Sequence, residues 1–329
     1  MKEEHKPTTA DIVTLNNIEN GLEPAKETSG LSRRAFLHTS ILGISGIALT
    51  SCTRGIMQRN NIELTRRQFA LPNLPKAFEG RTITFLSDIH SGPFMDLQEL
   101  KNLVQTVNAV GSDIIVLPGD FVTSEGDEIV PFTEAMSGLK APLGVYACTG
   151  NHDYYAGIER VSRGVEEAGI TLLRNENAKV TIDGQSLYFI GVDDDDSHTV
   201  AAYVEGRHAP HIEAAWQGIP SDAATILLCH KPYKFEDFAK TNVGLMLAGH
   251  THGGQIVLGR IGGAVLAFSA LASQYVDGLY LPQHSKSNTQ MYVSRGIGVV
   301  GVPIRINCPP EITQITLTSK NAELSPTLS

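Results

Sequence analysis

The chain has 329 residues, of which 42% are hydrophobic and 19% are charged, so it is able to bury a substantial core. Its formal net charge of −9 argues against a nucleic-acid binder, because such proteins need an excess of Lys and Arg to neutralise phosphates. The charge does not exclude a small phosphorylated substrate, since a bound metal ion can supply the local positive charge.

Residues 1–52 are predicted to be a polar leader and a targeting segment that lies outside the fold. Arg33 and Arg34 precede a short apolar stretch, which is typical of a twin-arginine export signal. Residues 49–52 are similar to a lipoprotein processing site that ends in Cys52. We therefore expect export and a place in the cell envelope, with the N-terminus at a membrane surface. An uncleaved anchor or a chance match is the alternative.

Residues 53–80 are predicted to be a lead-in, within which residues 62–69 are able to form an edge strand that Pro72 and Pro75 end. One main domain is expected over residues 81–317, followed by a polar tail over residues 318–329. The remaining cysteines, Cys148, Cys229 and Cys308, stand in or beside apolar runs, where buried free thiols are expected.

Five apolar runs in the main domain are each followed at once by a residue able to bind a metal. These runs are residues 82–86, 113–118, 144–148, 225–229 and 243–248. Continuous apolar runs of this length are typical of strands buried on both faces. Between them, Asp96 and Gly111 are able to cap the two ends of one helix, and residues 157–168 are predicted to form another. This alternation indicates an α/β fold.

In open α/β sheets, ligands bind beyond the carboxyl ends of the strands, so the residues after the five runs are expected to converge. The candidate site residues are Asp88, His90, Asp120, Asn151, His152, His230, His250 and His252. Carboxylate, amide oxygen and imidazole without thiolate suit Mn²⁺, Fe²⁺ or Zn²⁺.

The spacing of these residues supports a centre for two divalent metal ions. In extended chain, Asp88 and His90 point to the same face, and so do His250 and His252. Asp120 has two carboxylate oxygens, so it is the natural bridge between two ions. A lone Gly-Asp is usually a turn, but all five motifs in this order, each after a strand, favour the metal centre.

The motifs resemble those of the calcineurin-like metallophosphoesterases over residues 81–317. The resemblance implies a four-layer αββα sandwich and metal-dependent hydrolysis of phosphoesters. It assigns one ion to Asp88, His90, Asp120 and His252, and the other to Asp120, Asn151, His230 and His250. It makes His152 the general acid, with Asp153 or a backbone carbonyl expected to orient the ring.

Residues 294–298 and 303–312 are similar to the YkuE/YaeI-type subgroup, which is associated with the cell envelope and includes enzymes that split UDP-2,3-diacylglucosamine. The resemblance implies a phosphodiesterase or pyrophosphatase acting on a lipid-linked or nucleotide-sugar substrate. A broad phosphomonoesterase and a non-catalytic metal-dependent cell-wall or lipid-binding protein are the alternatives. Thr123 departs from the family pattern, since many relatives carry an acidic residue there, which bears on substrate choice.

Three further features keep two interpretations each. Residues 256–271 are either a buried hairpin or an apolar wall for an acyl chain. Arg295 either binds a substrate phosphate or forms a structural ion pair. Residues 193–196, all aspartates, are expected to be a solvated loop, with a further metal site as the alternative.

Overall fold

The computed structural model describes residues 58–194, 212–261, 264–267, 273–283 and 287–319. The predicted leader, the export signal and Cys52 lie outside the described residues, so export stays a prediction that cell fractionation would check. Within the described ranges, no helix is both long and apolar enough to cross a membrane.

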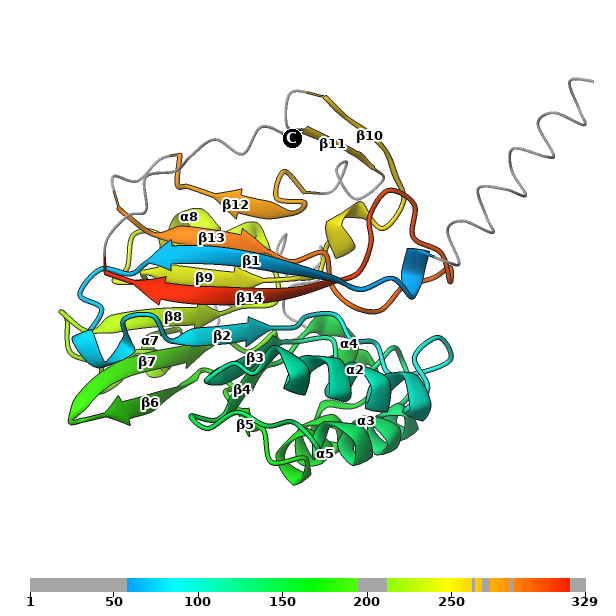
Figure 1. The fold of residues 1–329 in the computed structure, drawn as a ribbon, viewed down its shortest axis with the longest axis horizontal. Coiled ribbons are helices and arrows are strands. Elements are labelled where there is room, and N and C mark those ends of the chain that lie inside the picture. The colour runs from blue at the N-terminus through cyan, green and yellow to red at the C-terminus, as the bar shows by residue number, and fades with distance from the viewer. Residues whose placement is uncertain (1–57, 195–211, 262–263, 268–272, 284–286, 320–329) are drawn as a thin grey trace, which may run out of the picture. The chain divides into compact units, whose positions relative to one another are not determined.

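In the described residues, the strands form two six-stranded sheets and one hairpin (Figure 1). The first sheet has the order β1 (Glu63–Ala70), β14 (Glu311–Thr318), β2 (Thr82–Phe85), β3 (Ile114–Pro118), β4 (Val145–Cys148) and β5 (Thr171–Leu172). The second has the order β12 (Gly278–Tyr280), β13 (Gln290–Val293), β9 (Leu245–Ala248), β8 (Ala224–Leu228), β7 (Gln185–Gly191) and β6 (Glu176–Ile182). The hairpin pairs β10 (Val257–Ile261) with β11 (Ala264–Ala267).

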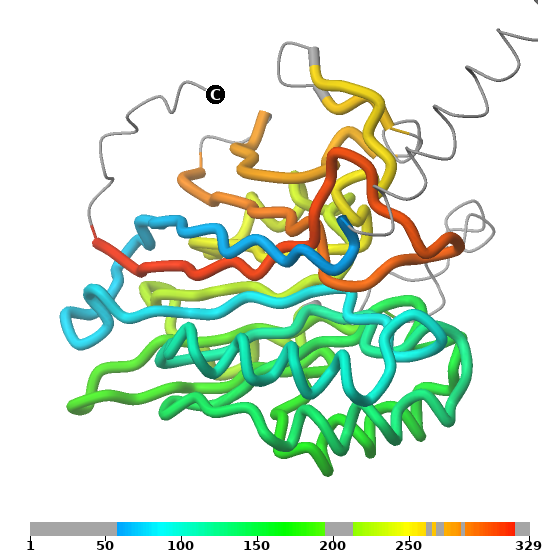
Figure 2. The backbone as a smooth tube through the Cα atoms, turned by 45° about the vertical axis from the view of Figure 1, so that its right-hand side comes forward, coloured from blue at the N-terminus to red at the C-terminus, as the bar shows by residue number. Residues whose placement is uncertain are grey.

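Helices cover the outer face of each sheet. The helices α2 (Leu97–Val110), α3 (Ile129–Met136) and α5 (Ile158–Glu167) pack on the first sheet, as Figure 2 shows. The short helices α7 (Ile212–Ala215) and α8 (Phe235–Phe238) contribute to the core on the outer face of the second sheet. A third core lies between the two sheets. The described residues therefore form helix, sheet, sheet and helix layers, which confirms the predicted αββα sandwich.

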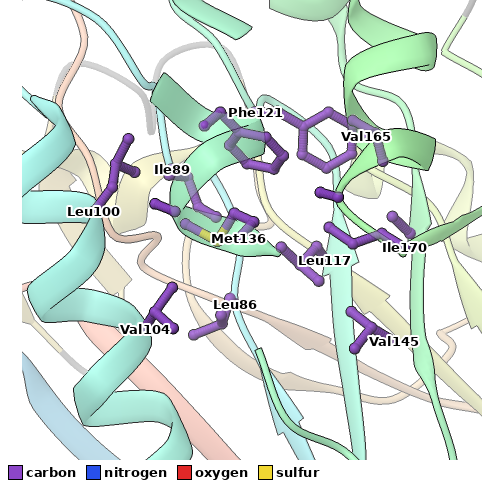
Figure 3. Close-up of a cluster of buried hydrophobic side chains, with 14 of the residues drawn as sticks. Leu86, Ile89, Leu100, Val104, Leu117, Phe121, Met136, Val145, Val165 and Ile170 are labelled. Atoms are coloured by element: carbon purple, nitrogen blue, oxygen red, sulfur yellow. The ribbon is translucent and has the colours of Figure 1, made fainter. Parts of the chain in front are cut away.

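The strands separate these cores by alternating their side chains. In β3, Ile115 and Leu117 pack under the helices, whereas Ile114 and Val116 face the second sheet. Figure 3 shows the core under the helices, where Leu117 lies among residues such as Leu100. Because a strand presents successive side chains to opposite faces, a sheet buried on both faces needs an unbroken apolar run.

Helix α2 begins and ends where its capping residues predict. The Asp96 side chain accepts a hydrogen bond from the Glu99 N–H at 2.9 Å, and the Glu99 carboxylate accepts one from the Asp96 N–H at 3.1 Å. Gly111 closes the helix in the left-handed conformation, with φ of 71°. Strand β1 lies at the edge of the first sheet and pairs in parallel with the whole of β14.

The topology brings the carboxyl ends of eight strands to one edge of the sandwich. Strands β2, β3, β4 and β5 run parallel in the first sheet, and β7, β8, β9 and β13 run parallel in the second. All five predicted metal-binding motifs directly follow strands of these two groups. They therefore meet at that edge.

Candidate metal centre

After β2, β3 and β9 the chain turns sharply, in conformations that side chains rarely adopt. Asp88, His90, Asp120, His250 and His252 all have positive φ, between 51° and 73°. A non-glycine residue with positive φ has a strained backbone, which persists only where surrounding contacts hold it. Residues of this kind are common at functional sites. Half of the ten positive-φ non-glycine residues in the described chain are predicted metal ligands, so the strain marks this edge of the sandwich.

Two glycines allow the strand ends to approach closely. A Cβ atom at Gly150 would overlap the Asp120 carboxylate, and one at Gly249 would overlap the side chains of Ser87 and Asp88. Only glycine fits at these two positions.

A first group of donor atoms gathers around His90 and His252. The Nε2 atoms of these two histidines lie 3.1 Å apart, and His252 Nε2 lies 3.6 Å from Asp88 Oδ1. His90 Nε2 also lies 3.6 Å from Asp120 Oδ2. One ligand atom from each of Asp88, His90 and His252 lies within 4.8 Å of the others, as a single cation needs. We call this group site 1.

A second group, site 2, forms on the other side of Asp120. His230 Nε2 lies 3.1 Å from Asp120 Oδ2 and 3.3 Å from His250 Nδ1. The buried Asn151 Oδ1 atom has no hydrogen-bond partner among the described residues. Burying an amide oxygen without a partner costs free energy. A cation bound to that oxygen would offset this cost. The residues therefore fit two cations that share Asp120.

Backbone groups hold the ligands in place. His230 Nδ1 donates to the Pro118 carbonyl at 2.9 Å, which leaves Nε2 to face Asp120. Asp88 accepts hydrogen bonds from the Ser87 hydroxyl at 2.5 Å and from the His250 N–H at 2.8 Å.

His152 lies beside site 1 and is oriented by a backbone carbonyl. Its Nδ1 hydrogen-bonds the Thr123 carbonyl oxygen, so Nε2 is left for a substrate. The ring lies edge-on to His90, with centroids 4.7 Å apart. Asp153 does not orient the ring. Its carboxylate accepts the N–H groups of Asp120, Phe121 and Gly150 at 2.8–3.0 Å and so fixes the turns that carry the ligands.

Burial and charge prepare most of these imidazoles to bind a cation. Burial lowers the pKa of His90 and of His250 to about 3, and it lowers the pKa of His252 well below its usual range. These rings are neutral at pH 7, as metal ligation requires. Burial opposes charge on Asp120 as well, but the neighbouring His230 holds the pKa of that carboxyl well below its usual range.

His230 differs, because its pKa is raised to about 10. Burial lowers it, but the charges of Asp120 and Asp88 outweigh that effect. Without metal, the ring therefore holds a proton below that pH. A cation must displace it, so metal binding is expected to release about one proton from this group, and metal affinity should rise with pH until His230 is neutral.

Calorimetric titration of metal-stripped protein with Mn²⁺, in buffers of different ionisation enthalpy between about pH 7 and 9, checks this linkage. Metal binding without proton release at the lower pH would contradict it.

Two other sequence interpretations are resolved. Arg295 forms an ion pair with Glu311 at 3.2 Å and with Glu63 at 3.1 Å, so it has the structural role. The solvated-loop prediction is wrong for Asp193 and Asp194, which are buried. Asp193 pairs with Arg174 at 3.1 Å and Asp194 pairs with Lys231 at 2.8 Å, while residues 195 and 196 lie outside the described chain.

The β10–β11 hairpin, which lies within residues 256–271, is buried on one side only. Val257 and Val265 contribute to a small core, whereas Leu258 is 76% exposed and Leu266 is 44% exposed. The three cysteines Cys148, Cys229 and Cys308 are free and buried, as predicted.

A family model described as calcineurin-like phosphoesterase matches residues 81–254, which contain all eight candidate site residues. The chain belongs to this family. The resemblance seen in the motifs is thereby confirmed.

Individual relatives of the chain also have names that include metallophosphoesterase. The chain is 29% identical to the uncharacterized metallophosphoesterase YkuE of Bacillus subtilis over 302 residues, covering 88% of this chain and 99% of that protein. It is 32% identical to a zebrafish (Danio rerio) transmembrane protein with metallophosphoesterase domain, covering 76% of this chain and 56% of that protein. It is 33% identical to an uncharacterized metallophosphoesterase of Helicobacter pylori, covering 73% of this chain and 60% of that protein. The chain thus spans little more than half the length of several curated relatives.

Proposed function

We propose that the protein is a two-metal phosphodiesterase or pyrophosphatase of the cell envelope that acts on a lipid-linked or nucleotide-sugar substrate. The observation that carries the reaction is the approach of both donor groups to Asp120 Oδ2, which lies 3.6 Å from His90 Nε2 and 3.1 Å from His230 Nε2, with His152 beside them. Asp88, His90, Asp120 and His252 would hold one cation, and Asp120, Asn151, His230 and His250 the other. Two bound cations would polarise the phosphoryl oxygens and lower the pKa of a water nucleophile.

The residues of the chain do the remaining chemistry. One ring nitrogen of His152 is on a carbonyl, which leaves the other to protonate the oxygen of a leaving group. Its backbone N–H donates to Asp120 Oδ1 at 2.9 Å, which ties the proposed acid to the shared ligand.

A cavity of about 360 Å³ opens beside these residues and supports an apolar substrate group. Its lining combines the polar Asp120, His152 and His252 with the apolar Ile256 and Val300. The Gln255 side chain holds this apolar wall. It donates to the carbonyls of Val300 and Val302 at 3.0 and 3.1 Å and accepts from the Val300 N–H at 2.9 Å.

A series of phosphodiesters with one p-nitrophenyl group and a methyl, butyl or octyl second ester tests the proposal in the presence of Mn²⁺. We expect kcat/KM to rise along the series, because each buried methylene contributes up to about 0.8 kcal/mol. Val300→Asn should flatten this dependence. Val130→Asn is the matched control, since Val130 is a 57% exposed valine on α3 and does not line the cavity.

The possible outcomes separate the parts of the proposal. Hydrolysis without dependence on chain length would overturn the apolar substrate class. Faster turnover of p-nitrophenyl phosphate than of every diester would favour the phosphomonoesterase. Two bound metals with no turnover of any ester would favour the non-catalytic alternative.

A further inference from the structure

Arg305 is a buried cation beside site 1. Its side chain is fully buried and is the largest among the completely buried side chains of the described residues. Its hydrogen bonds go to backbone carbonyls and to the Cys308 sulfur, and it also contacts a ring nitrogen of His252. Buried guanidinium groups are usually paired with carboxylates, because an uncompensated charge is costly to bury. Carbonyl oxygens hold this one instead.

The carbonyls that Arg305 binds belong to three places in the chain, which are residues 296–298, His252 and Cys308. Its Nε and Nη2 atoms donate to the Gly298 carbonyl at 3.1 and 2.6 Å, and Nη2 also reaches the Gly296 carbonyl at 3.2 Å. Nη1 reaches the carbonyls of His252 and Cys308 at 3.4 and 3.3 Å. Nη2 lies 3.5 Å from His252 Nδ1, on the side of the ring opposite the Nε2 atom that faces site 1.

Residues 296–298 in turn support the first two ligands of site 1. The Gly298 N–H donates to the Asp88 carbonyl at 2.7 Å, and the Ile297 N–H donates to the Ser87 carbonyl at 2.9 Å. The contact is so close that a Cβ atom at Gly298 would come within 3.0 Å of the His90 Cβ. A shift of this segment would therefore move the backbone that carries Asp88 and His90.

We propose that Arg305 is a positioning residue for site 1, whose ligands it holds more directly than it holds those of site 2. One planar guanidinium links the segment behind Asp88 and His90 to the backbone of His252. Its contacts in the described chain include none of the ligands particular to site 2, which are Asn151, His230 and His250. A lysine keeps the charge but lacks the planar fork that binds several carbonyls at once.

Titration of the metal-stripped full chain with Mn²⁺ tests this inference, which rests on the proposed two-metal function. The wild type should bind two ions. In Arg305→Lys, one binding step should weaken by about 10–100-fold, the range found when groups that orient metal ligands are lost. The other step should stay unchanged. In Arg305→Lys, the electron paramagnetic resonance signal of coupled Mn²⁺ pairs should disappear at stoichiometric Mn²⁺. It should return when Mn²⁺ is added in excess.

Arg295→Lys is the matched control, because Arg295 is a nearby arginine whose ion pairs go to Glu311 and Glu63. It should leave both steps intact. Equal weakening of both steps in Arg305→Lys, or no weakening, would overturn the inference. A wild type that binds no Mn²⁺ would instead overturn the proposed function. If Arg305→Lys does not fold, Gly298→Ala displaces the same segment and must show the same one-site loss.

Discussion

Replacing Asp120 with asparagine is expected to lower kcat/KM by about 10³-fold or more on every phosphoester. The Oδ2 atom of Asp120 faces His90 of site 1 at 3.6 Å and His230 of site 2 at 3.1 Å. An amide offers one neutral oxygen in place of two charged ones, so the two proposed cation sites lose their common ligand. Metal ions supply several kcal/mol of transition-state stabilisation, and each 1.4 kcal/mol is tenfold in rate.

Steady-state kinetics and metal analysis measure the effect, and Asp183→Asn controls for the loss of a carboxylate. Asp183 has φ of 49°, close to the 56° of Asp120, and lies exposed at the turn between β6 and β7. The control should keep full activity and both metals. Asp120→Asn protein that retains two tightly bound ions and wild-type turnover would refute the bridging role.

Replacing His152 with alanine is expected to leave both metals bound while turnover becomes strongly dependent on the leaving group. The group lost is the free ring nitrogen, because the other nitrogen is held by the Thr123 carbonyl. General acid catalysis contributes typically 10²–10⁴-fold, so diesters with alkoxide leaving groups should slow by about that factor. A p-nitrophenolate leaving group needs no proton and should depart with a much smaller loss.

The helix that carries His152 should survive this change. His152 lies in α4 (Asn151–Tyr155), alanine favours helices, and the hydrogen bond to Asp120 comes from the backbone. Leaving-group series for wild type and variant, with metal content measured on the same samples, make the comparison. Equal losses on alkyl and aryl substrates would show that His152 is not the acid.

The candidate site could be predicted because its residues follow strands in the sequence. A parallel strand carries a local signal, the unbroken apolar run, and parallel strands in one sheet share an edge. Asp88, Asp120 and His230 each stand one or two positions after such a run, so their convergence follows from pattern alone. The caps of α2 could be predicted for the same reason, since Asp96 and Gly111 are neighbours of the helix they close.

The partners of these residues could not be predicted, because they come from distant parts of the chain. No periodicity pairs Arg295 with Glu63, which lies 232 positions away. His152 is oriented by a carbonyl, which every residue carries, so its partner Thr123 has no distinctive sequence signal. Arg305 was not singled out in the sequence, and its burial against backbone carbonyls is known only from the structure.

The position of β14 has a consequence for how the chain folds. This strand lies between β1 and β2, and its Gln314 is 248 positions from its neighbour Arg66 on β1. Among the described strands, β14 is the only partner of β1, so the first strand stays unpaired until nearly the whole domain has been synthesised. Closing so long a loop carries an entropic cost before any contact offsets it. Residues 296–298, which support Asp88 and His90, are also made late, so site 1 is completed only when synthesis of the domain is nearly finished.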